Sequence, residues 1–260
     1  MRPRFGPGPT PAATPQPARR QPAVALSDRT PVLEKLRRHP ANLHLGLMLA
    51  LTFSTGVADA VGYLGLDKVF TGNMTGNVVI LGMAIAGAPG LPVAGPLLAL
   101  FTFMLGAAVG GRVLRPVAIG WSTHATVLFG AQGLIMLVLA MVLFAGGGVP
   151  PHPFGLLITG SLAAVMGLQA SVARHIGVKD VTTVVVTSTI TGFAADSRLG
   201  GGKGQPWFRR LAAIVLILLG AGVGALLLTF NIAWGVALSA LITLTVTAIG
   251  HAAGRPHHAP

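Results

Sequence analysis

One acidic residue interrupts the first long apolar run of the chain. Asp59 lies about four turns into the run from His44 to Leu66, which contains no other charged side chain. Thr55 and Tyr63, four residues to either side, share its face of a helix. An ionisable side chain at such depth in a membrane is costly and points to function. Asp59 is therefore predicted to bind a proton or a cation, unless it is a helix-end carboxylate that hydrogen-bonds a neighbouring helix.

Amide and hydroxyl side chains alternate in a short segment that follows this run. They are Thr71, Asn73, Thr75 and Asn77, with Gly72 and Gly76 between them. Glycine lets two backbones approach closely, and the four side chains offer both donors and acceptors. The pattern suits the lining of a path for a small polar solute, or a cation held through oxygens. Helix–helix packing is the alternative, because small and hydroxyl residues are favoured there too.

The surrounding sequence must place these groups inside a membrane. Of the 260 residues, 52% are hydrophobic and only 9% are charged, whereas soluble domains have roughly 25% charged residues. Uncharged runs cover residues 93–111, 123–149, 211–230 and 232–250, and about 20 apolar residues suffice for a helix to cross the hydrocarbon core. These runs lack strict alternation, so an outer-membrane barrel is a poor fit. The predicted fold class is an all-α, polytopic membrane bundle.

Two halves of the chain resemble each other, at about 44–146 and 154–250. TGVADAVGYLGL (55–66) matches MGLQASVARHIG (166–177), and LGAAVGG (105–111) matches LGAGVGA (219–225). The offset stays between 111 and 114 residues, which indicates an internal duplication. The small-xxx-small words of the second pair are expected to pack the two repeats together.

Each half has three long apolar segments and one short polar segment, at about 69–88 and 181–197. The second short segment is rich in hydroxyl groups, at Thr182, Thr183, Thr187, Ser188, Thr189 and Thr191. Thr187 is predicted to line the path from this half. Gln169 falls near the position that Asp59 has in the first half, so the paired site is expected to be asymmetric in charge.

Charge decides which segments cross the membrane. Suppose that only the six long segments cross, at 44–66, 93–114, 123–146, 154–174, 208–229 and 232–250. Nine of the ten Lys and Arg residues after the N-terminal region then fall on one side, and only Lys68 on the other. Basic residues mark the cytoplasmic side. With three crossings each, the repeats are inverted and both termini are cytoplasmic. The short segments are then predicted to be broken or re-entrant, as in transporters and channels, rather than ordinary short helices.

The ends of the chain flank a membrane domain at 41–252. Residues 1–40 are basic and Pro-rich and are expected to form a disordered tail, with a short interfacial helix from Thr30 to Arg38. No apolar h-region follows the basic start, so a signal peptide is not expected. Residues 253–260 form a short C-terminal tail. Asp196, close to Arg198, is expected to form a surface ion pair.

Two blocks of the chain resemble the YoaK-like family, a bacterial group filed as a domain of unknown function. They are FSTGVADAVGYLGLDKVFTGNMTGNVVILGMAIAG (53–87) and GLQASVARHIGVKDVTTVVVTSTITGFAADSRLGG (167–201). The match covers residues 40 to 250 approximately and leaves out the basic tail. The resemblance implies a six-helix protein of the bacterial inner membrane. It implies no substrate.

These residues favour a secondary transporter or channel for a small polar or ionic solute, with the lipid bilayer as the other partner. A membrane scaffold that transports nothing is the alternative, and its polar residues would face lipid or another protein. An intramembrane enzyme is not expected, because the chain has no cysteine, no HExxH and no paired carboxylates. No cofactor, nucleotide or metal motif occurs, and nucleic-acid binding is excluded because the basic residues flank apolar segments. Assembly into a homo-oligomer stays open.

Overall fold

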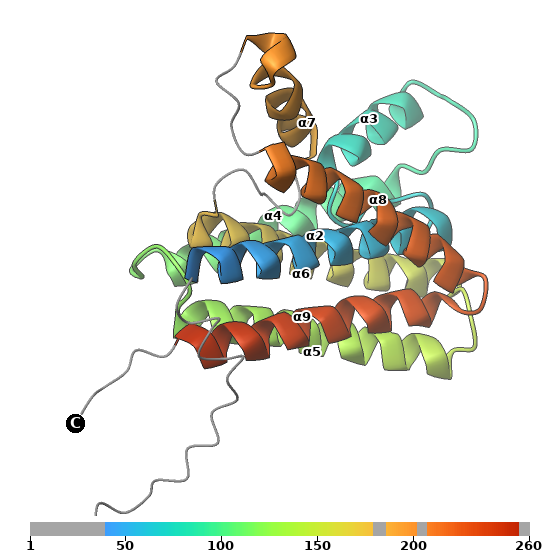
Figure 1. Cartoon of the computed structure of the whole chain (residues 1–260). Helices are drawn as coiled ribbons and strands as arrows, with labels where there is room; N and C mark the ends of the chain where they lie inside the picture. The colour runs from blue at the N-terminus through green and yellow to red at the C-terminus, as the bar shows by residue number, and fades with distance from the viewer. Residues whose placement is uncertain (1–39, 179–185, 202–206, 255–260) are drawn as a thin grey trace, which may run out of the picture.

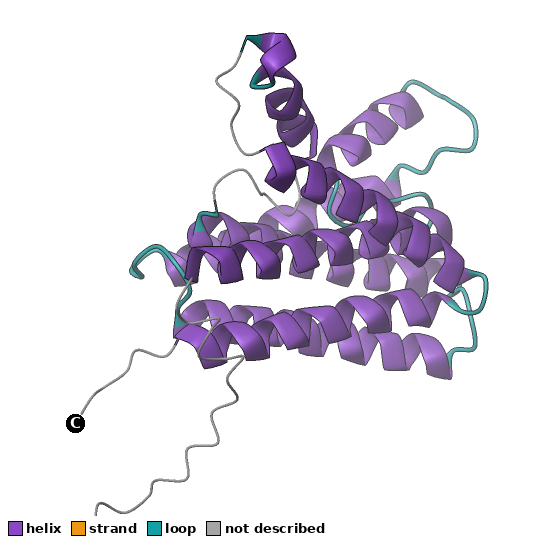
Figure 2. Cartoon of the chain, in the orientation of Figure 1, coloured by secondary structure: helices purple, strands orange, loops and turns teal. Residues whose placement is uncertain are grey.

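The computed structural model describes residues 40–178, 186–201 and 207–254 (Figure 1). Over these residues every regular element is a helix (Figure 2). The long helices are α2 (Pro40–Gly65), α4 (Ala94–Leu114), α5 (Thr123–Ala145), α6 (His152–Ile176), α8 (Trp207–Leu228) and α9 (Ile232–Gly254). The short ones are α3 (Met74–Ile85) and α7 (Val186–Ala195), and a 3-10 turn, η1 (Arg198–Gly200), follows α7.

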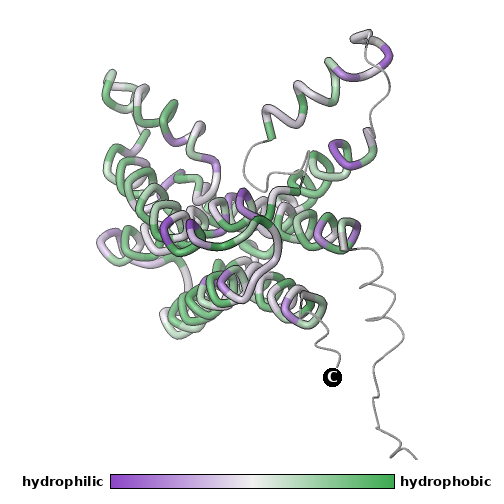
Figure 3. Tube along the Cα trace, turned by 90° about the vertical axis from the view of Figure 1, so that its left-hand side faces the viewer, coloured by the Kyte–Doolittle hydropathy of each residue, from purple (hydrophilic) through white to green (hydrophobic). Residues whose placement is uncertain are grey.

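Six helices are long and apolar enough to cross a membrane. The shortest of these spans has 21 residues, which at 1.5 Å a residue is about 31 Å, close to the thickness of the hydrocarbon core. Figure 3, which looks along these helices from one end, shows mostly apolar residues in them. The predicted polytopic helical membrane bundle is confirmed.

The main contacts of the bundle join one half of the chain to the other. α2 packs along α8, and α6 packs along α4. α5 and α9 lie side by side along one flank (Figure 1), where α5 contacts α6 and α9 contacts α2. Of the short helices, α3 packs on α4 and α7 packs on α8. Each of these contacts has a counterpart with the two halves exchanged.

Glycine lets the backbones of two helix pairs, α2 with α8 and α6 with α4, approach closely. We call these two contacts the glycine seams. A Cβ on Gly56 in α2 would collide with the carbonyl oxygen of Ile217 in α8, and a Cβ on Gly167 in α6 with that of Phe103 in α4. Gly167 follows Gly56 by 111 residues, and Ile217 follows Phe103 by 114. The two seams are therefore equivalent, and at both the backbones touch more closely than any larger residue would allow.

The glycines of GAAVG and GAGVG extend this equivalence. A Cβ on Gly106 would collide with the carbonyl oxygen of Ala164, and a Cβ on Gly220 with that of Phe53. Ala164 follows Phe53 by 111 residues, so these contacts match as well. The prediction that the small-xxx-small words pack the two halves together is confirmed.

The helix bounds depart from the prediction mainly at the short segments. α3 begins at Met74 rather than at residue 69, because residues 66–73 form no helix. α7 covers Val186–Ala195 of the predicted 181–197. Residues 181–185, which include Thr182 and Thr183, lie outside the described residues, as do the tail at 1–39, the helix expected from Thr30 to Arg38, and residues 255–260.

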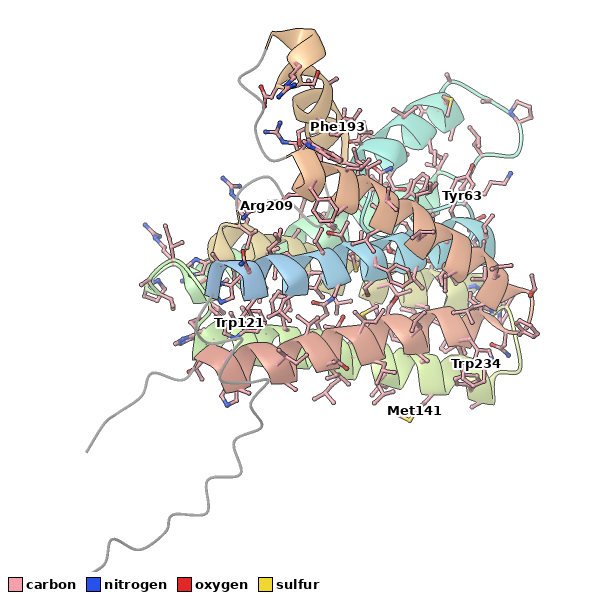
Figure 4. The ribbon with its side chains drawn as sticks, in the orientation of Figure 1. Tyr63, Trp121, Met141, Phe193, Arg209 and Trp234 are labelled. Atoms are coloured by element: carbon pink, nitrogen blue, oxygen red, sulfur yellow. The ribbon has the colours of Figure 1, made fainter. Side chains whose placement is uncertain are left out.

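The two ends of the bundle differ in charge. We call the end with Trp121 and Arg209, on the left of Figure 4, the basic end, and Trp234 and Tyr63 mark the opposite end. The ends of α4 and α6 and the start of α8 meet at the basic end and carry Arg112, Arg115, Arg174, Arg209 and Arg210. At the opposite end, Lys68 is the only Lys or Arg among the described residues.

Candidate functional site

A sharp turn sends the chain back along α2 after the helix ends. Asp67 and Lys68 both adopt the left-handed conformation, with φ of 59° and 54°, which residues other than glycine seldom occupy. The Gly62 carbonyl accepts from the N–H groups of Leu66 and Val69 at 3.1 and 3.4 Å. Residues 69–73 therefore run back into the membrane span beside the helix that they have just left.

The returning segment lies so close to α2 that a glycine is needed there. A Cβ on Gly62 would collide with the carbonyl oxygen of Val69, and Val69 and Thr71 are fully buried. Gly72 then meets Asp59, which is six residues before the end of α2 and so about 9 Å inside it. Irregular backbone at this depth must find its hydrogen bonds within the protein, because lipid offers none.

Asp59 provides those hydrogen bonds through one oxygen. Its Oδ1 accepts from the Gly72 N–H at 2.6 Å, the Asn73 N–H at 3.4 Å and the Thr71 hydroxyl at 3.3 Å. The carboxylate thus accepts from the two residues that directly precede α3, whose N–H groups have no partner in a helix. No described residue donates to Oδ2, and the side chain is only half-buried. One oxygen of Asp59 is structural, and the other is open.

The two asparagines of the segment differ in role. Asn73 is the N-cap of α3, where its Oδ1 accepts from the Gly76 N–H at 3.2 Å. Asn77 turns back instead: its Oδ1 accepts from the Phe70 N–H at 2.9 Å, and its Nδ2 donates to the Phe70 carbonyl at 2.6 Å. Asn77 is fully buried. It fixes the returning segment through both of these hydrogen bonds, and its predicted role in binding a solute stays a prediction.

A cavity of about 240 Å³ lies where α3 and α7 begin. We call it the central cavity. Figures 1 and 3 show the two short helices leaving this region in diverging directions. The residues of its wall used below are Asp59, Asn73, Thr75, Phe103, Thr187 and Ile217. A carboxylate, an amide and two hydroxyl groups therefore share one small space with two apolar side chains.

Equivalent residues of the two halves contribute to this wall. Thr187 follows Thr75 by 112 residues, and Ile217 follows Phe103 by 114. Asp59 has no acidic counterpart, because the residue 111 positions later is Ala170. The central cavity thus lies between related elements, and the part of its wall that the structure describes has a single carboxylate.

Gln169, which was predicted to share the site, lies in a separate buried cluster. Its Nε2 donates to Thr55 Oγ1 at 3.0 Å, and its Oε1 accepts from Gln132 Nε2 at 2.6 Å. Thr55 donates to the Leu51 carbonyl at 2.9 Å. The side chains of Gln132, Gln169 and Thr55 are fully buried. This cluster joins α2, α5 and α6, so Thr55 and Gln169 hold the bundle together and do not line the cavity.

Gln132 is the member of this cluster that the sequence reasoning missed. It is the only Asn or Gln in the uncharged run at 123–149, and a buried amide needs hydrogen-bond partners, so a signal was present. Its Oε1 is buried without a hydrogen-bond partner among the described residues.

Arg210 of α8 holds the far end of α7. Its Nη1 donates to Asp196 Oδ2 at 2.6 Å and to the Gly192 carbonyl. Both acceptors lie at the end of α7, where the last carbonyls have no helical partner and the helix dipole favours a cation. The ion pair expected for Asp196 therefore forms with Arg210.

Four of the eight predicted site residues come together. The four on the wall of the central cavity are Asp59, Asn73, Thr75 and Thr187. The other four are buried outside it: Thr55, Thr71, Asn77 and Gln169. Solute binding by the first four stays a prediction. Over the described ranges, no three His, Cys, Asp or Glu side chains are grouped to hold a metal ion.

Comparison with known proteins places this architecture in a group of uncharacterised proteins. The model of a family described as a protein of unknown function (DUF1275) matches residues 47–249. A protein of Bacillus subtilis (strain 168) named "UPF0700 transmembrane protein YoaK" is 31% identical over 188 residues, which cover 69% of this chain and 82% of that protein. No solved structure matches.

Proposed function

This chain belongs to the DUF1275 family and is a multi-pass integral membrane protein, and from its central cavity we propose that it is a secondary transporter or channel for a small polar or ionic solute. The family description names no activity, so the proposal rests on the residues. The observation that carries it is the meeting of Asp59, Asn73, Thr75 and Thr187, from α2, α3 and α7, on one cavity.

The chemistry of this wall suits a small solute. The open oxygen of Asp59, the Asn73 amide and the two threonine hydroxyls are donors and acceptors that a solute can use. Polar groups inside a membrane span cost free energy unless they have partners. The volume of about 240 Å³ is below the roughly 300–1,000 Å³ typical of sites for drug-sized ligands. A solute of a few heavy atoms fits this space.

An inverted arrangement of the two halves supports the same proposal. Trp121 and Trp234, which hold matching positions in the two repeats, lie at opposite ends of the bundle (Figure 4). The short helices α3 and α7 would then be re-entrant segments that enter from opposite sides and meet at the cavity, as in inverted-repeat transporters. The positive charge at the basic end supports a cytoplasmic position for that end and for the N-terminus.

A non-transporting scaffold is the alternative, and the position of the polar groups disfavours it. In a scaffold these groups would be expected to face lipid or a partner, whereas here four of them gather on one small, partly open cavity between elements of the two halves. An enzymatic function has less support, because among the described residues of the cavity wall Asp59 is the only carboxylate and none of them forms a nucleophile with an adjacent base.

The experiment uses the absence of cysteine from the chain. A single cysteine at Thr75, on the cavity wall, is treated with membrane-impermeant thiol reagents in right-side-out and inside-out vesicles. A transport path exposes this cysteine to water from both sides. Cysteines at Val149 and Thr123, at opposite ends of α5 and its flanking loop, report vesicle sidedness. Labelling of the Thr75 cysteine from one side only, or from neither, would count against transport.

A further inference from the structure

A second cavity lies at the basic end, between α4 and α6. Its volume is about 850 Å³, and we call it the basic vestibule. Small residues leave the space open, namely Ala107, Gly111, Ala170 and Ser171. Arg115 and Arg174 are at its outer end, in or next to the last turns of α4 and α6.

Phe103 connects this vestibule with the central cavity. It is the only residue among those described on the walls of both. Arg115 is 12 residues further along α4, which is about 18 Å at 1.5 Å a residue. The basic vestibule therefore extends from the basic end to about the middle of the membrane span, where Phe103 is on its wall and on that of the cavity that contains Asp59.

The charge of the vestibule has one sign. Arg115 and Arg174 are exposed on its wall, with the half-buried ring of His175 beside them, and no described acidic residue lines it. Arg112 and Arg115 line an adjoining cavity of about 510 Å³. A cleft lined by one sign of charge between low-dielectric walls concentrates counter-ions. This vestibule would concentrate anions.

The backbone of Phe103 is held in place more tightly than its side chain. Its carbonyl oxygen is in tight contact with Gly167 of α6, which fixes α4 at this point. The side chain is half-buried and packs on one side against Val69, Ala99 and Ala163. A change of its rotamer, rather than a movement of α4, would open the passage. Ile217 has the equivalent position on α8 and lines the central cavity but not the vestibule.

We propose that the basic vestibule is the entrance through which a small anion reaches the central cavity, and that the side chain of Phe103 is the gate between them. This inference rests on the proposed transport function and adds the substrate class and one end of the path. An anion in the central cavity meets the open oxygen of Asp59, and two negative groups at contact repel each other unless a proton lies between them. The anion would therefore travel together with a proton.

The test measures how fast the Thr75 cysteine reacts from the basic end. The probes are two methanethiosulfonates of similar size, one with a sulfonate and one with a trimethylammonium group. Phe103→Ala should raise both rates severalfold from the basic end. Phe101→Ala, the matched control, removes an equal ring from an exposed position of α4 that lies on neither wall, and it should leave both rates unchanged. Phe103→Leu serves as the milder variant, with an intermediate rate expected. Unchanged rates in stable, inserted Phe103 variants would overturn the gate.

The arginines are tested in the same assay. The double variant Arg115→Gln/Arg174→Gln should lower the ratio of anionic to cationic reagent rates by about tenfold, because the local attraction is lost. In the wild type, high salt should lower the ratio in the same direction through screening. An unchanged ratio would overturn the anionic assignment. So would loss of co-purified anionic phospholipid without a change in the ratio, because the arginines would then bind lipid headgroups.

The two proposals fail in different ways. Suppose that the Thr75 cysteine in the otherwise unchanged chain reacts from both sides, but that the Phe103 and arginine variants do not change its rates. The transport path then stands, and this vestibule is not its entrance. If that cysteine reacts from neither side, the transport function itself is contradicted.

Discussion

The backbone N–H of Gly72 donates to Asp59 over 2.6 Å, so a carboxylate on the wall of the central cavity also holds the backbone just before a membrane-embedded helix. The same residue thus fits both alternatives that the sequence allowed, a functional carboxylate and a structural one. The two roles fall on different oxygens of the carboxylate. Oδ1 accepts all three hydrogen bonds, and Oδ2 accepts none from the described residues. Any substitution of Asp59 has to be designed with this division in view.

The glycine seams give the first prediction. Gly220→Ala places a methyl group against the Phe53 carbonyl and should force α8 away from α2, at a cost of about 1–3 kcal/mol in the free energy of unfolding. Gly222 lies on the same helix, and a methyl group there would have nothing within 4 Å of it. Gly222→Ala should therefore leave stability unchanged or raise it slightly. Thermal unfolding in detergent, followed by size-exclusion chromatography, compares the two. Equal stability of both variants would contradict the close seam.

The equivalent seam extends this test. Gly106→Ala should lose about as much stability as Gly220→Ala, because Ala164 holds the place of Phe53. Gly111, with open space around it on the same helix, provides the control for α4. A large difference between the Gly106 and Gly220 variants would show that the two halves, although equivalent in geometry, differ in energy.

These seams also show why much of the fold was predictable. A membrane span is read from the length of an uncharged run, and a run that keeps a glycine at a fixed offset in both halves marks the place where two backbones touch. Both signals are local in the sequence. The six spans and the packing between GAAVG, GAGVG and the opposite half could therefore be predicted.

The course of residues 66–73 could not be predicted, and so it could not be foreseen which of the predicted site residues share one cavity wall. The reversal depends on Asp67 and Lys68 in the left-handed conformation, where no glycine signals a turn. That turn decides that Thr75 faces the cavity while Asn77 binds the backbone of Phe70. For Gln169 the missing information was its partner, because Gln132 lies on a distant span.

The buried amide cluster gives the second prediction. Gln169→Leu removes an acceptor for Gln132 and a donor to Thr55, and it leaves a buried amide unpaired, which costs about 1–3 kcal/mol. The double variant Gln132→Leu/Gln169→Leu removes both amides together and should recover most of the loss. Thermal stability of the single and double variants forms a complete cycle. A double variant that is less stable than Gln169→Leu would contradict this account.

Arg210 gives the third prediction. Arg210→Gln removes the charge that binds Asp196 at the end of α7, so α7 should dock less firmly on α8. Amide hydrogen exchange in α7 should become faster, with little change in α2 or α6. Arg209→Gln is the matched control, since it removes an equal charge from the neighbouring position. The same increase in both variants would mean that net charge matters here and the ion pair does not.

Orientation is the fourth prediction. With the arginines at the basic end facing the cytoplasm, a cysteine at Val149 should react with an impermeant reagent in intact bacterial cells. A cysteine at Thr123 should react only after the membrane is permeabilised. Val149 is preferable to the neighbouring Gly147, whose φ of 73° suits glycine and strains a cysteine. If the Thr123 cysteine reacts in intact cells and the Val149 cysteine does not, the orientation is the opposite one, with the N-terminus outside.

The last prediction separates the two oxygens of Asp59. Asn in its place keeps an acceptor for the Gly72 N–H, so the backbone before α3 should stay in place. The protein should therefore insert and remain monodisperse. The open oxygen becomes an NH2 group, which cannot take up a proton. Asp59→Ala removes the acceptor as well, and should lower the free energy of unfolding by about 1–3 kcal/mol because buried donors lose their partner.

A flux measurement then distinguishes a role of Asp59 in proton coupling from its structural role in binding Gly72. Proteoliposomes loaded with a pH-sensitive dye receive formate, a small anion, on the outside together with a pH step. In the wild type, formate should carry protons inward and lower the internal pH faster than in empty liposomes. Asp59→Asn should abolish this difference while its thermal stability stays near that of the wild type, because only the proton site is lost. If proton-coupled flux persists in a stable Asp59→Asn protein, the carboxylate has its structural role alone, because the hydrogen bond from Gly72 is the one function that the amide preserves.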